Sequence, residues 1–168
     1  NSSNSNMANA EPNHCNTLRV AALQMVSGRD YAENQATAER LLIEARQSGA
    51  ELAVLPENFL TYGSRQQLSN DSQEQFIQAF SGLAKKLHLW IVAGTFPLTI
   101  PPAAQDTARG VLKPQAMTLI FDNNGQLHSH YAKIHLFDVD VTDTQRHYRE
   151  SDDFRHGDHP NTFDSPWG

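Results

Sequence analysis

Two ionisable side chains each follow an apolar, strand-like run, and their types suit acid–base chemistry. Glu57 follows the run 51–55 and Pro56, and Lys133 ends the alternating run 126–133. A carboxylate at the end of a buried strand faces the crevice where α/β proteins collect ligands and could act as a general base. An ammonium in such a crevice could stabilise a developing oxyanion. Each residue also has an ordinary interpretation: a surface or helix-N-terminal glutamate for Glu57, and a snorkelling strand-end lysine for Lys133.

A second carboxylate could serve Lys133. Glu150 lies in the segment Tyr-Arg-Glu-Ser at 148–151, upstream of a Gly-Asp pair at 157–158. Composition alone predicts a loop residue in a charged stretch. If Glu150 lies beside Lys133, its negative charge would hold the ammonium in place and keep it charged.

The sequence predicts no metal site. Six of the eight histidines fall between His128 and His159, but their spacing matches no helical or finger motif, and no cysteine is nearby. The acidic residues from 138 to 143 resemble the start of a calcium loop, yet the loop's glycine and terminal glutamate are both missing. The single cysteine, Cys15, lies in a polar stretch where nothing lowers its pKa, and we interpret it as an incidental thiol.

Periodicity predicts alternating strands and helices, which indicate an α/β core. Strands are expected at 18–25, 51–55 and 89–94, and helices at 30–48 and 72–87. The first helix has Asp30 as its N-cap and Gly49 as its stop. Four prolines between 97 and 114 indicate a surface loop, and the chain beyond Phe137 reads as loop.

A hairpin is expected around Asn123-Asn124-Gly125, with strands at 117–122 and 126–133. Alternation places Leu127, Tyr131 and Lys133 on one face of the second strand. His128 and His130 fall on the other face.

Composition limits the classes of partner and compartment. The 168 residues carry a net charge of -6, which disfavours nucleic acid and anionic membrane as partners. The apolar runs are too short to span a bilayer, and one cysteine cannot form an internal disulfide, so a cytoplasmic protein is expected. Residues 1–17 are polar and are predicted to be a disordered tail, in which Met7 would be the natural start; the domain would comprise 18–168.

The motifs around these residues resemble those of the nitrilase superfamily, the carbon–nitrogen hydrolases. Leu55-Pro56-Glu57 is similar to the family's base box, and Lys133 begins a Lys-Ile-His-Leu-Phe-Asp segment similar to its lysine box. The segment around Glu150 resembles the one that carries the family's second glutamate. The boxes look most like those of the ω-amidase and deaminated-glutathione amidase branch.

The resemblance implies an α-β-β-α sandwich and a Cys-Glu-Lys triad that hydrolyses a non-peptide carbon–nitrogen bond in a small amide. Glu57 would be the base, Lys133 the oxyanion donor and Glu150 a positioning group. No metal or organic cofactor is implied, and the full-length parent would form a homodimer or a higher oligomer.

The family's cysteine has no counterpart here, and 162–168 resembles the lead-in to it. We therefore expect a fragment, truncated before the nucleophile strand, that is catalytically inert by itself. The alternative is a nucleophile-less binding or decoy domain of the same fold.

Overall fold

A computed structural model describes residues 17–60, 70–99, 113–139 and 148–168. Its main sheet has five strands in the order β1-β2-β3-β4-β5. β1, β2 and β3 run parallel to one another, whereas β4 is antiparallel to both β3 and β5. The bounds are β1 Val20–Ala22, α1 Tyr31–Gln47, β2 Leu52–Val54, α2 Asn70–Leu87, β3 Trp90–Leu98, β4 Gln115–Phe121, β5 Leu127–Ala132, β6 Asp138–Val139, β7 Tyr148–Arg149 and α3 Glu150–Asp153.

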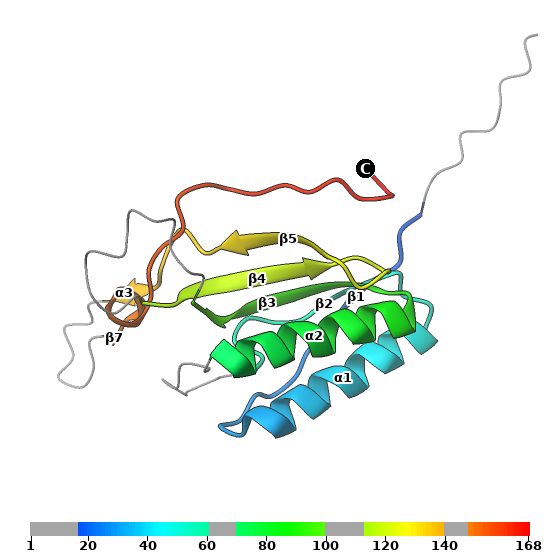
Figure 1. Ribbon diagram of the computed structural model, residues 1–168, viewed down its shortest axis with the longest axis horizontal. Coiled ribbons are helices and arrows are strands. Elements are labelled where there is room, and N and C mark those ends of the chain that lie inside the picture. Colours follow the sequence, from blue (N-terminus) through cyan, green and yellow to red (C-terminus); the bar gives the residue numbers. More distant parts are fainter. Residues whose placement is uncertain (1–16, 61–69, 100–112, 140–147) are drawn as a thin grey trace, which may run out of the picture.

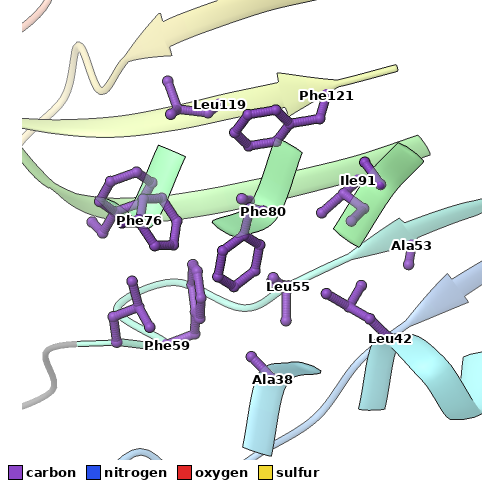
Figure 2. Packing of buried hydrophobic residues seen from close by; sticks show 14 of the residues in the cluster. Ala38, Leu42, Ala53, Leu55, Phe59, Phe76, Phe80, Ile91, Leu119 and Phe121 are labelled. Carbon is purple, nitrogen blue, oxygen red and sulfur yellow. The ribbon is translucent and has the colours of Figure 1, made fainter. Parts of the chain in front are cut away.

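Both long helices cover the same face of the sheet (Figure 1). Their apolar stripes pack against the strands, and the rings of Phe59, Phe76 and Phe80 meet in the core (Figure 2). Phe96 of β3 joins this group through contacts with the rings of Phe59 and Phe76. Contacting ring centroids in this group lie between 4.3 and 6.2 Å apart. Since each buried aromatic ring removes a large apolar area from water, this cluster contributes to holding the helices against the sheet.

The ends of α1 follow the predicted capping chemistry. The Asp30 side chain accepts a hydrogen bond from the Glu33 amide at 3.0 Å and so satisfies one of the helix's free N–H groups. Gly49, directly after the C-cap Ser48, has a φ of 88°. The predicted left-handed stop is therefore confirmed.

The hairpin is also confirmed, but the face predicted for Leu127 was wrong. β4 and β5 pair around a turn in which Gly125 has a φ of 82°. The register shifts between Ile120 and Phe121, so Leu127 pairs with Phe121 and shares the face of His130, which pairs with Leu119. This β-bulge inserts one residue into β5 and breaks strict alternation, so Leu127 and Tyr131 lie on opposite faces.

Three other expectations need correction. The first strand was predicted to be buried, but Val20 in β1 is exposed because β1 is an edge strand. β3 extends through Pro97 to Leu98, so the predicted loop at 97–114 begins too early, and its central part lies outside the described residues. Beyond Phe137 the chain adds a small two-stranded sheet, β6–β7, and the single-turn helix α3.

The last segment of the chain runs along the sheet face opposite the helices (Figure 1). There Trp90 of β3 contacts the rings of Phe163 and Trp167, with centroids 6.0 and 5.9 Å away. The predicted tail at 1–17, including Cys15, lies outside the described residues except for Thr17.

Candidate active site

The turn that carries Glu57 is fixed to the neighbouring strand. Upstream, the Leu55 amide donates to the Val92 carbonyl at 2.9 Å; downstream, the Asn58 amide donates to the Thr95 carbonyl at 2.9 Å. Asn58 has a φ of 54°, a left-handed conformation that asparagine tolerates better than most residues. Glu57 therefore projects from a tight turn at the carboxyl end of β2.

Lys133 follows directly after β5, and its backbone is held on both sides. Its amide donates to the Ala116 carbonyl at 2.9 Å, and its carbonyl accepts from the Gly157 amide at 2.8 Å. A Cβ added to Gly157 would lie only 2.3 Å from the Ala132 carbonyl oxygen, so glycine permits this close approach. The backbone of Lys133 thus occupies a defined position between two segments.

The sheet topology explains why Glu57 and Lys133 meet. β5 runs antiparallel to β4, which runs antiparallel to β3, so β5 points in the same direction as β2 and β3. The carboxyl ends of β2 and β5 therefore lie at the same end of the sheet, and Glu57 and Lys133, which follow these strands, both lie there. The Lys133 Nζ lies 2.8 Å from Glu57 Oε1, although the two residues are 76 positions apart.

Glu150 is the second carboxylate that contacts the Lys133 ammonium. It was predicted to be a loop residue but is the first residue of α3, and it is buried. Its Oε2 accepts from Lys133 Nζ at 3.0 Å and from the Phe137 amide at 2.6 Å. The Glu150 amide in turn donates to the Phe137 carbonyl at 3.1 Å. These two hydrogen bonds between Glu150 and the Phe137 backbone hold the Glu150 carboxylate beside the Lys133 ammonium.

The three charged groups differ in their access to water. The exposed fractions of the side chains are 53% for Glu57, 23% for Lys133 and 8% for Glu150. Burial lowers the pKa of Lys133, but hydrogen bonds to Glu57 and Glu150, with the attraction of both negative charges, outweigh it and raise the pKa above the ordinary lysine value. The ammonium is therefore held in its charged form.

The two carboxylates differ in burial and in hydrogen bonding, so they suit different chemical roles. Glu150 is buried and engaged by two donors, so it suits a supporting role. Glu57 keeps half of its side chain open to solvent while touching the ammonium, so it could exchange a proton with an approaching molecule. Lys133 supplies a fixed positive charge that a developing oxyanion could share.

Sequence reasoning named these three side chains but missed the backbone groups that hold them. The Phe137 amide and carbonyl and the Gly157 amide are contacts that carry no residue-type signal, apart from the requirement for glycine at 157. Among the described residues, no group of three or more histidine, cysteine, aspartate or glutamate side chains is arranged to hold a metal ion. No helix in the described part is long and apolar enough to cross a membrane.

A family comparison shows to which family the chain belongs. The model of the carbon–nitrogen hydrolase family matches residues 19–168, nearly the whole described chain. The chain belongs to the carbon–nitrogen hydrolase family. The resemblance predicted from the motifs around Glu57, Lys133 and Glu150 is thereby confirmed at the level of the family.

Individual relatives of this carbon–nitrogen hydrolase agree with the predicted branch. A deaminated glutathione amidase from Yersinia enterocolitica is 34% identical over 89% of the chain and 51% of its own length. An ω-amidase from Xenopus tropicalis is 28% identical over 89% of the chain and 51% of its own length. The chain thus spans about half the length of the curated relatives it matches.

Solved structures confirm the nitrilase-type α/β fold. The Caenorhabditis elegans NitFhit protein matches with a TM-score of 0.68 and 26% identity, over 89% of this chain and 35% of that one. An amidase from Nesterenkonia matches with a TM-score of 0.71 and 20% identity, over 90% of this chain and 52% of that one.

Proposed function

We propose that this carbon–nitrogen hydrolase contributes the base and the oxyanion donor to the hydrolysis of a small amide. The observation that carries the proposal is the contact of one ammonium with two carboxylates, Lys133 with Glu57 at 2.8 Å and with Glu150 at 3.0 Å. Family membership and the amidase names of its relatives support the reaction class. A small ω-amide is the proposed substrate, by analogy with those relatives.

The roles follow from chemistry and exposure. In amide hydrolysis by a thiol, the thiol loses a proton, its sulfur attacks the carbonyl carbon, and the amine leaves with a proton; water then cleaves the thioester. Glu57 would accept the thiol proton and deliver it to the leaving amine. Lys133 would stabilise the negative oxygen of the tetrahedral intermediate, and Glu150 would hold Lys133.

The proposed reaction needs a thiol nucleophile, and residues 17–168 contain none, because the single cysteine of the sequence is Cys15. We propose that the nucleophile belongs to the remaining half of a protein as long as its relatives, and that residues 1–168 alone do not turn over amide. The proposed whole protein is cytoplasmic and forms a homodimer or a higher oligomer. No metal or organic cofactor takes part in the proposed reaction.

A second candidate is a domain that binds an amide without cleaving it. The observation in its favour is that Lys133 already has two carboxylate partners within residues 1–168, so a binding site could exist without a thiol. A binding domain would retain a small amide at this site and release no ammonia.

Ammonia release from a small ω-amide by a protein of the relatives' length tests the proposal. Glu57→Gln and Lys133→Ala should each reduce kcat by about 10²–10⁴-fold while the fold is retained, because a base or an oxyanion donor typically contributes that much. Glu44→Gln, on the exposed face of α1, is the matched control and should keep full activity. Near-normal turnover by either site variant would refute the roles, and amide binding without turnover in the wild type would favour the binding domain.

A further inference from the structure

One polar residue interrupts the buried stripe of α1. The buried residues of this helix are Asn34, Ala38, Leu42 and Ala45, which recur at helical spacing along the face that meets the core. Asn34 is only 3% exposed. A buried amide is costly unless its hydrogen bonds are satisfied, so its partners indicate why it is there.

The Asn34 side chain joins two segments that are distant in sequence. Its Nδ2 donates to the Gly28 carbonyl and to the Leu60 carbonyl, both at 2.9 Å, and its Oδ1 accepts from the Gly28 amide at 2.8 Å. Gly28 lies between β1 and α1, and Leu60 lies three positions after Glu57. Asn34 thus connects the entry of α1 to the turn that carries the proposed base.

A neighbouring hydrogen bond reinforces the connection. The Ser27 hydroxyl donates to the Phe59 carbonyl at 2.9 Å. The turn is therefore fixed to β3 by the bonds of Leu55 and Asn58, and to the start of α1 by the bonds of Phe59 and Leu60. Glu57 lies between Leu55 and Asn58, directly before the attachments of Phe59 and Leu60.

We propose that Asn34 is a positioning residue, whose side-chain amide holds the Glu57 turn at the place where the carboxylate meets Lys133. The inference rests on the proposed function for its catalytic meaning. Asn34 acts through the Leu60 carbonyl rather than by touching the reacting atoms. Since a displacement of about 1 Å in a catalytic group can cost on the order of 10²-fold in rate, a clamp on this turn matters to the chemistry.

The test reads the Glu57–Lys133 contact directly in residues 1–168, so it does not depend on turnover. The Lys133 side chain is titrated by NMR with labelled lysine, and its signal is assigned with Lys133→Arg. In the wild type the ammonium should titrate above the ordinary lysine value, because Glu57 and Glu150 both stabilise it. In Asn34→Ala the Glu57 carboxylate should move away, and the midpoint should fall toward that of a Glu57→Gln variant.

Leu42→Ala is the matched control. Leu42 lies on the same buried stripe of α1 as Asn34, and its aliphatic side chain cannot form a hydrogen bond to the Glu57 turn. This variant should lose stability and leave the Lys133 midpoint unchanged. Ser27→Ala, at a half-buried site, weakens the same connection more mildly and keeps the test decisive if Asn34→Ala does not fold.

An unchanged Lys133 midpoint in folded Asn34→Ala, or in Ser27→Ala if only that variant folds, would overturn the inference and leave Asn34 with a purely structural role. In the protein of the relatives' length, the same substitution should lower kcat by about 10- to 100-fold with little change in KM. A fallen midpoint in a protein that never turns over amide would sustain the positioning role and reject the proposed function.

Discussion

Removing the Glu150 carboxylate should destabilise the protein far more than removing the carboxylate of a shorter ion pair. Arg40 and Glu44 on α1 lie 2.6 Å apart, and Lys133 and Glu150 lie 3.0 Å apart, so distance alone would rank the helix pair first. Burial reverses the order. The side chains of Arg40 and Glu44 are 61% and 53% exposed, whereas that of Glu150 is 8% exposed.

The expected magnitude follows from the donors that Glu150 serves. Glu150→Ala would remove the carboxylate oxygen that accepts from both the Phe137 amide and the Lys133 ammonium. A hydrogen bond to a charged group contributes about 1.5–3 kcal/mol, so a loss of about 3 kcal/mol in the free energy of unfolding is expected for the two bonds together. For a chain of this size, that loss lowers Tm by roughly 6–12 °C.

Glu150→Gln separates charge from shape. With its oxygen at the Oε2 position, the glutamine could still accept from the Phe137 amide and from Lys133. Its NH₂ group would then replace Oε1, 3.4 Å from the Lys133 Nζ, and would face the ammonium unfavourably. An intermediate loss of about 1–2 kcal/mol is expected.

Urea denaturation at pH 7 of wild type, Glu150→Ala, Glu150→Gln and Glu44→Gln gives the comparison. Glu44→Gln tests the exposed helix pair and should cost only about 0.3–0.5 kcal/mol. If Glu44→Gln cost as much as Glu150→Ala, the reasoning from burial would be wrong.

Further predictions concern glycine and tyrosine. Gly157→Ala should lower Tm, because the new Cβ would meet the Ala132 carbonyl oxygen at 2.3 Å. Gly82 is exposed on α2, and a Cβ there would meet nothing within 4 Å, so Gly82→Ala should raise the free energy of unfolding by up to about 1 kcal/mol. Thermal unfolding of both variants checks the contrast. Tyr31→Phe should be neutral or stabilising at pH 7, since the buried Tyr31 hydroxyl makes no hydrogen bond to any residue that the structure describes. Burial raises the pKa of Tyr31 to about 12 from 10.0, so the unfolded chain ionises first, and the free energy of unfolding is unaffected by Tyr31 below pH 10 and falls as the pH rises from 10 toward 12. Between pH 9 and 12, the free energy of unfolding should fall less steeply for Tyr31→Phe than for the wild type. Parallel curves of this free energy against pH for the two proteins would contradict the prediction.

Much of the fold could be predicted because local signals determine it. The caps of α1, the apolar stripe of α2 and the Asn-Asn-Gly turn each encode their element within a few residues. The bulge that separates Leu127 from Tyr131 could not be predicted, since it depends on pairing with β4. The exposure of Val20 also depends on which strand lies at the edge of the sheet.

The site divides in the same way. Glu57 and Lys133 could be named because each follows a recognisable strand, and residues that end parallel-running strands meet at one edge. Glu150 was named through the family resemblance, and its burial was not foreseen because it depends on the Phe137 backbone rather than on neighbours in sequence. Asn34 gave no signal as a site residue, because its role lies in contacts with segments on either side of Glu57.

The attachment of the 148–157 segment has a consequence for how the site can open. The buried core cluster draws its members from residues 38–121, and Glu150 lies outside it. Polar contacts join this segment to the rest of the chain: the β6–β7 pairing, further main-chain hydrogen bonds from the amides of Glu150, Arg155 and Gly157, and side-chain hydrogen bonds of Lys113, Gln115 and Lys133. Regions that lie outside the core and are held by polar contacts open at lower free energy than the whole molecule. We therefore expect the Glu150 carboxylate to separate from the Lys133 ammonium by local opening, at a lower free energy than the unfolding of the sheet and both long helices.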